Sequence, residues 1–234
     1  MALSSITKKL IMSISGLFLI VFLLLHMTIN FFSVIDTFAG TYGSADGLFQ
    51  AGCDFMALPI ITIMVPVLAL GFLVHIAYAL ILSYGNYKAR GTERYAVANK
   101  TKAESWAAKN MLVLGVIVLG FAVFHMSHFW AEMQYVEWFK GEHVHPESVY
   151  ALMELTFGKW WMVAIYIVWF AALWFHLTHG FWSAFQSIGW SNNVWQTRLE
   201  CLGKAVATLL VVLLSVTAVV ACLVANGVIP GSVL

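Results

Sequence analysis

The sequence predicts an all-α membrane protein with five transmembrane helices in a bundle. Of its 234 residues, 62% are hydrophobic and only 10% are charged, which is far more apolar than a soluble domain of this size requires. The apolar residues fall into five long runs, and a membrane-spanning helix needs about 20 such residues. A transmembrane barrel would show short alternating segments instead.

The five runs cover about residues 10–34, 58–84, 109–134, 158–188 and 204–228, within a single transmembrane domain over residues 1–234. The first run follows MALSSITKKL and continues past His26 to about Ile35 without a clear small-residue cleavage site at its end. We therefore expect an uncleaved first helix rather than a secretory signal.

The connections between the runs differ in composition. Residues 35–57 contain four glycines among small and acidic residues and predict an exposed loop with room for one short helix. The connection between the second and third runs is basic and long enough to present a surface to a soluble partner. Residues 137–155 are acidic and are expected to form a solvated loop that holds His143 and His145. The fifth run is uniformly small and aliphatic and is expected to be scaffold.

Charge is sorted across the runs. Ten of the twelve Lys and Arg residues lie before run one, between runs two and three, or between runs four and five. These are Lys8, Lys9, Lys88, Arg90, Arg94, Lys100, Lys102, Lys109, Arg198 and Lys204. Eight of the eleven acidic residues lie on the other side. By the positive-inside rule, the N-terminus is cytoplasmic and the C-terminus lies outside.

Each of the first four runs contains a histidine: His26, His75, His125 and His176. Ionisable residues at membrane depth are costly and usually functional. His26 and His125 lie 17 and 16 residues after Lys9 and Lys109, so both belong to the outer half of the membrane. His75 lies 13 residues before Lys88 and His176 lies 14 residues before the interfacial Trp190, so both belong to the inner half.

Two pairs at matched depths suggest two haem sites. Two different helices can place imidazoles on opposite faces of one haem, with the ligand nitrogens about 4 Å apart. A lone histidine can equally be a satisfied core residue, but four at two depths favour ligands. His128 and His179 each lie three residues beyond a candidate ligand, on the same face and closer to an interface. Either could contact a haem propionate or a quinone instead.

Short motifs connect these histidines to a known family. They are KKLIMSISG at the start of run one, His26 with Asn30, His75 with Tyr78, IVLGFAVFH ending at His125, and FHLTHGFWSAFQSIGW from residue 175. Through residue 190 the sequence resembles the single-chain, five-helix dihaem cytochrome b that anchors bacterial succinate dehydrogenases and quinol:fumarate reductases. The family pattern of a ligand followed four residues later by glycine selects His176 over His179, and the match at the end of the aliphatic run selects His125 over His128.

The resemblance implies cofactors and partners. It implies two haems b, with axial pairs His26/His125 and His75/His176, and a quinone, with menaquinone expected. A flavoprotein and an iron–sulfur subunit would dock on the cytoplasmic face of a bacterial inner membrane. Succinate and fumarate chemistry would then lie in those subunits, and this chain would carry electrons. Some members also have a glutamate two residues before the helix-four ligand for proton transfer, but Trp174 occupies that position here.

Polar residues near the inner end are candidates for contacts with propionates or a quinone: Lys9, Ser13, Lys88 and Arg90. His128, nearer the outer surface, and His179, nearer the inner one, are further candidates. Each can also be an ordinary interfacial residue. Two other functions compete with the main reading. One is the cytochrome b of another respiratory complex, of the hydrogenase or formate dehydrogenase type. The other is a haem-free transporter, which would need more charged residues inside its runs than this chain has. The three cysteines are far apart in sequence and predict no metal site.

Overall fold

The computed structural model describes residues 3–90, 106–135, 139, 146–190 and 192–233, without the side chains of 62, 90, 134 and 146–148. The described part is helical and contains no strand. Five helical stretches are long and apolar enough to cross a membrane, which agrees with the five predicted runs and makes the chain a multi-pass membrane protein by length and composition. They are Ser5–Ala39 (α1), Pro59–Ala89 (within α3, Pro59–Arg90), Met111–Met133 (α5, Met111–His128, continuing into α6, Trp130–Tyr135), Trp160–Ile188 (α8) and Trp195–Ala225 (α9).

Two predicted connections differ from the structure. Residues 35–39 belong to α1 rather than to a loop, and the predicted solvated loop over 137–155 contains the start of a further helix, α7, Pro146–Phe157. The reason is burial: Asp36 in α1 and Glu154 in α7 are 1% and 2% exposed, and partners satisfy the oxygens of both carboxylates. The expected short helix in the first connection is α2, Leu48–Met56.

Tertiary contacts divide the chain into two compact units that share the long helices. Unit 1 comprises Met1–Leu23, Ile63–Val116 and Leu173–Thr208, and unit 2 comprises Leu24–Thr62, Ile117–Ala172 and Leu209–Leu234. The early part of α1 therefore belongs to unit 1 and its later part to unit 2. The two histidines of each candidate pair lie in the same unit: His26 and His125 in unit 2, and His75 and His176 in unit 1.

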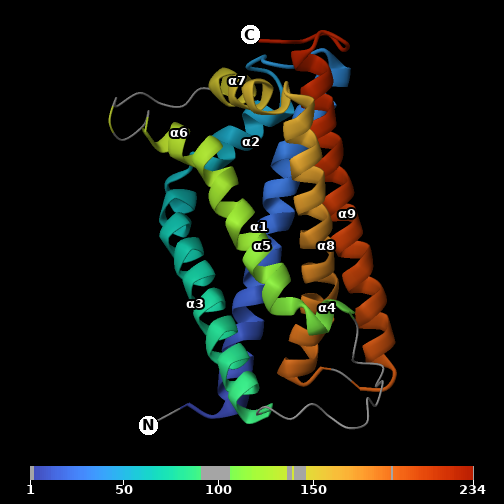
Figure 1. Ribbon diagram of the computed structural model, residues 1–234. Coiled ribbons are helices and arrows are strands. Elements are labelled where there is room, and N and C mark those ends of the chain that lie inside the picture. Colours follow the sequence, from blue (N-terminus) through green and yellow to red (C-terminus); the bar gives the residue numbers. More distant parts are fainter. Residues whose placement is uncertain (1–2, 91–105, 136–138, 140–145, 191, 234) are drawn as a thin grey trace. The chain divides into compact units, whose positions relative to one another are not determined.

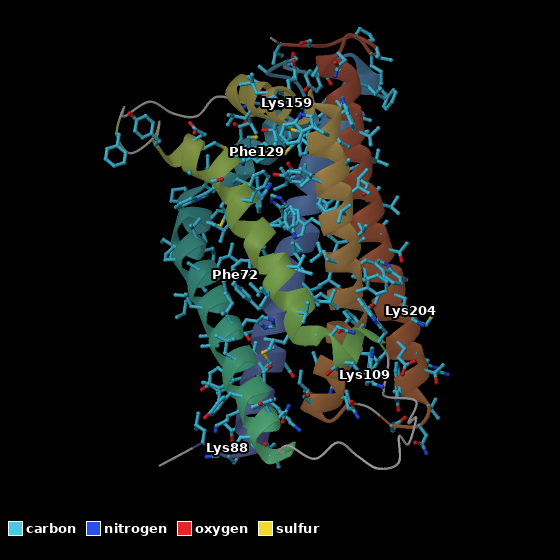
Figure 2. All side chains as sticks on the ribbon, viewed as in Figure 1. Phe72, Lys88, Lys109, Phe129, Lys159 and Lys204 are labelled. Carbon is cyan, nitrogen blue, oxygen red and sulfur yellow. The ribbon has the colours of Figure 1, made fainter. Side chains whose placement is uncertain are left out.

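In unit 1, the first part of α1 runs beside α3 (Figure 1). Phe22 and Phe72 meet edge to face at 6.4 Å between ring centroids, and a Cβ at Gly71 would lie 2.7 Å from Phe18. Glycine at this position therefore lets the two helices approach closely. Lys88 and Lys109 lie at the same end of unit 1, below Phe72 in Figure 2, as the charge sorting predicts for two basic helix ends.

Unit 2 has a core of buried hydrophobic side chains from α1, α2, α7, α8, α9 and the junction of α5 and α6. Its buried members are Ile29, Phe49, Phe129, Tyr150, Met153, Phe157, Met162, Val163, Tyr166, Trp169, Phe170, Ala218 and Ala221. The short helices α2 and α7 pack against each other within this unit (Figure 1). The later part of α1 ends at Gly40, which has φ of 74° and lets the Thr41 amide donate to the Asp36 carbonyl at 2.9 Å.

Asp36 fixes the start of α2. One of its carboxylate oxygens accepts from the Leu48 amide and the other from the Phe49 amide, each at 2.8 Å. These are the first free N–H groups of α2, whose N-cap residue, Gly47, provides no side chain for the purpose. A Cβ at Gly47 would lie 2.7 Å from an Asp36 oxygen, so only glycine permits this approach. The capping carboxylate thus comes from the preceding transmembrane helix.

Candidate functional site

The structure brings the four run histidines together as two pairs, and both members of each pair come from different helices. In unit 2, the rings of His26 (α1) and His125 (α5) have centroids 5.8 Å apart and planes 86° apart. In unit 1, the rings of His75 (α3) and His176 (α8) have centroids 6.4 Å apart and planes 71° apart. These are the partners that the depth argument predicts from the sequence.

The ring spacing fits axial coordination of one iron by two imidazoles. Metal–imidazole bonds of about 2.0 Å, with each ring centroid about 1.2 Å behind its nitrogen, put the centroids of two axial rings roughly 6.4 Å apart. The observed separations of 5.8 and 6.4 Å lie near this value. Each axial ring can rotate about its own metal–nitrogen bond, so the steep angles between the ring planes are compatible with the same arrangement.

The number of donors in each site also matters. Within the described residues, no group of three or more His, Cys, Asp or Glu side chains could hold a metal ion. A zinc site needs three or four protein ligands, whereas a haem supplies four nitrogens and needs only one or two from the protein. A pair of imidazoles therefore matches the number of protein ligands that a haem needs.

His75 has a hydroxyl partner on the neighbouring helix. Its Nδ1 lies 3.4 Å from Oγ of Ser15 in α1, and that Oγ in turn donates to the Met12 carbonyl at 3.0 Å. The same edge of the ring lies close to the α1 backbone, because a Cβ at Gly16 would be 3.1 Å from Cε1 and 3.5 Å from Nδ1 of His75. Ser15 and Gly16 of α1 are therefore the residues against which the His75 ring packs.

His176 is held differently. A Cβ at Gly115 in α5 would lie 3.5 Å from its Cε1, which is an ordinary contact distance. Its Nδ1 is buried and has no hydrogen-bond partner among the described atoms. A buried imidazole nitrogen without a partner costs free energy, by about 1–3 kcal/mol for a lost hydrogen bond. A ligand bound between His75 and His176 would change the surroundings and the protonation of the His176 ring.

In unit 2, His125 has a tyrosine partner. Nδ1 of His125 lies 3.3 Å from the hydroxyl of Tyr166 in α8. Tyr166 is 1% exposed, and its ring packs at 4.9 Å from that of Phe157 and 5.5 Å from that of Trp169. The Trp169 ring also lies 5.9 Å from that of His125. Aromatic side chains therefore surround this histidine with apolar surface.

His26 contacts an amide on its own helix. The Asn30 amide nitrogen donates to the His26 carbonyl at 2.8 Å and lies 3.5 Å from its Nδ1. The second distance is at the limit of a hydrogen bond and does not fix which ring nitrogen carries the proton. His26 and Asn30 are four residues apart, so they lie one helical turn apart on the same face of α1.

The second histidine of each doublet lies outside the ring pairs. Nδ1 of His128 lies 2.9 Å from the Phe124 carbonyl, and its ring tilts on that of Phe124 at 4.3 Å between centroids. The His179 ring meets Trp182 edge to face at 5.1 Å, and its buried Nδ1 has no partner among the described atoms. The geometry therefore favours His125 and His176 as the members that face a partner imidazole.

The polar residues predicted to contact a propionate or a quinone differ in their exposure. Lys9 and Lys88 are exposed in unit 1, while Ser13 on the same helix as Lys9 is buried. The side chain of Arg90 lies outside the described residues, as do His143 and His145. Their roles toward a propionate or a quinone stay predictions.

Other residues of the site were not found by sequence reasoning. Ser15 and Tyr166 are ordinary helix residues in the sequence, and only the relative rotation of the helices shows that they face His75 and His125. Trp174, the residue that replaces the expected glutamate, donates from Nε1 to Thr208 of α9 at 2.9 Å. It therefore joins α8 to α9 within unit 1 and offers no titratable group.

Comparison with models of known protein families, with curated proteins and with solved structures found no match. The functional assignment therefore depends on the residues of the chain itself.

Proposed function

We propose that this chain is a dihaem cytochrome b that anchors a succinate:quinone oxidoreductase and carries its electrons to or from a membrane quinone. The observation that supports it best is the pairing of four intramembrane histidines into two sets, at 5.8 and 6.4 Å between ring centroids. His26 and His125 would hold one haem b, and His75 and His176 the other.

The protein residues account for the type of chemistry. Two imidazoles per iron complete its coordination and leave no position for oxygen or substrate, so a haem bound in this way supplies one-electron transfer. Ser15 and Tyr166 contact Nδ1 of one histidine in each pair, so that Nε2 would be the nitrogen left to hold a metal. The apolar rings around His125 exclude water from its site.

The partners follow from the resemblance and the charge sorting. A flavoprotein and an iron–sulfur subunit would dock at the basic end, which includes Lys88 and Lys109, on the cytoplasmic side of a bacterial inner membrane. Menaquinone is the expected quinone. Since the oxidation of succinate would occur in the flavoprotein, this chain would be the quinone-reactive, electron-transferring subunit of the enzyme.

Reduction by substrate tests this function. Native membranes that contain the complex are made anaerobic and given succinate, hydrogen or formate, and the α-band of haem b is recorded. We expect succinate to reduce the haem and fumarate to reoxidise it. Reduction by hydrogen or formate and not by succinate would assign the chain to a hydrogenase or formate dehydrogenase. A chain without haem in these membranes would contradict the cytochrome assignment altogether.

A further inference from the structure

We propose that Ser15 and Tyr166 are positioning residues that set the protonation, orientation and electron-donating strength of one axial histidine in each site. The inference rests on the proposed haem-binding function. It concerns hydroxyl groups that neither touch the iron nor belong to the predicted ligand set. Each acts within one unit, Ser15 on His75 and Tyr166 on His125.

The Ser15 hydroxyl has a fixed direction. It has one hydrogen, and the Met12 carbonyl at 3.0 Å can only accept, so that hydrogen points to Met12. With its hydrogen on Met12, the same oxygen presents its lone pairs to Nδ1 of His75 at 3.4 Å and can accept an N–H from it. This arrangement favours the tautomer of His75 with the proton on Nδ1, in which the Nε2 lone pair would be free for a metal.

The surroundings hold this arrangement in place. Ser15 is 8% exposed, so water does not compete for its hydroxyl. The adjacent Gly16 admits the edge of the His75 ring, since a Cβ there would be 3.1 Å from Cε1. Two consecutive residues of α1 therefore determine both the rotation and the tautomer of a histidine on α3.

Tyr166 plays the same part for His125 with a different side chain. Its ring is enclosed by Phe157, Trp169 and Phe170, with centroids 4.9, 5.5 and 6.0 Å away, so its hydroxyl cannot move far from Nδ1 of His125. The phenolic oxygen can accept from the N–H at 3.3 Å. Coordination through Nε2 requires the proton on Nδ1, and Tyr166 provides the acceptor for it.

An acceptor on Nδ1–H increases the basicity of the ligand and so stabilises the ferric iron. Removing it should shift the midpoint potential of that haem to a more positive value. We expect Ser15→Ala to shift only the haem bound by His75 and His176. Tyr166→Phe, which removes a single oxygen, should shift only the other haem. A tenfold change in the ferrous-to-ferric ratio at a given potential corresponds to ~59 mV for one electron.

The test is a redox titration of each haem in the purified complex, followed by the α-band and by low-temperature electron paramagnetic resonance, with haem content measured in parallel. Matched controls are Ser215→Ala, which removes a hydroxyl that donates to the Val211 carbonyl, and Tyr42→Phe, which removes a buried hydroxyl away from the histidine pairs. We expect both controls to leave the two potentials unchanged. Ser15→Thr keeps the hydroxyl and should restore the wild-type potential.

The outcomes separate the two proposals. A positive shift confined to one haem, at full haem content, supports the positioning role. Loss of one haem in Ser15→Ala with retention in Ser15→Thr supports it as well. Two haems with unchanged potentials in Ser15→Ala and Tyr166→Phe would overturn this inference and leave the cytochrome function intact, and so would identical behaviour of the Ala and Thr variants. Absence of haem from the wild-type complex would overturn the proposed function itself.

Discussion

The hydroxyl of Tyr150 donates to a carboxylate oxygen of Asp36 at 3.0 Å and so joins α7 to the end of α1. The same carboxylate accepts from the Thr41 hydroxyl and from the first amides of α2. Burial and the negative charge of Asp36 raise the pKa of Tyr150 well above its usual value, so the phenol stays protonated as a donor. Three segments of unit 2 thus depend on one carboxylate.

Asp36→Ala is therefore expected to destabilise the protein. The substitution leaves the Leu48 and Phe49 amides and the Tyr150 hydroxyl without their acceptor, and each hydrogen bond to a charged group contributes about 1.5–3 kcal/mol. We expect a fall in the free energy of unfolding of at least ~3 kcal/mol, seen as a lower melting temperature in detergent. The control is Asp46→Ala, whose side chain is exposed in the same connection. Equal melting temperatures for the two variants would contradict the structural role of Asp36.

Gly16→Ala should disturb the site formed by His75 and His176 more than Gly115→Ala does. The added Cβ lies 3.1 Å from Cε1 of His75 in the first case and 3.5 Å from Cε1 of His176 in the second. The first distance requires the imidazole to move by a few tenths of an ångström, whereas the second is ordinary contact. Haem content and the α-band of both variants provide the comparison. A larger effect at Gly115 would show that the helix packing around His75 and His176 differs from that described.

The thiol of Cys53 in α2 should react slowly with maleimide at neutral pH. Burial, and secondarily the negative charge of Asp54, raise its pKa to about 11. Below that pH the thiolate fraction increases about tenfold per pH unit, so the labelling rate should increase from pH 7 to pH 10 without a plateau. The measurement uses a Cys201→Ser, Cys222→Ser background, in which Cys53 is the remaining cysteine. Asp54→Asn should accelerate labelling at pH 8. A rate that levels off near pH 8.5 would indicate an ordinary exposed thiol.

The sequence predicted the five apolar helices and the histidine partners because both depend on position along a helix. Residue counts from Lys9 and Lys109 give depth directly, and depth alone pairs His26 with His125. Counting does not give rotation about the helix axis, which decides that Ser15 faces His75. It also missed α7 and the last turn of α1, because the acidic side chains of Glu154 and Asp36 suggested solvent. Both carboxylates instead hold backbone amides inside unit 2.

Depth in the membrane also does not separate the two histidines of a doublet. His125 and His128 lie on one helical face, and their membrane levels differ by only one turn. The structure distinguishes them through their neighbours: the ring of His26 lies 5.8 Å from that of His125, while Nδ1 of His128 lies 2.9 Å from the Phe124 carbonyl. The same distinction applies to His176 and His179 in unit 1.

The most direct measurement is the haem b content per chain by pyridine haemochrome assay of the purified complex. Wild type is compared with His26→Ala, His75→Ala, His125→Ala and His176→Ala, and with His128→Ala and His179→Ala as matched controls on the same helices. The account predicts two haems in wild type and in both controls, and disturbance or loss of one haem in each of the four ligand variants. No haem in wild type, or loss of a haem in the controls but not in the four ligand variants, would contradict it.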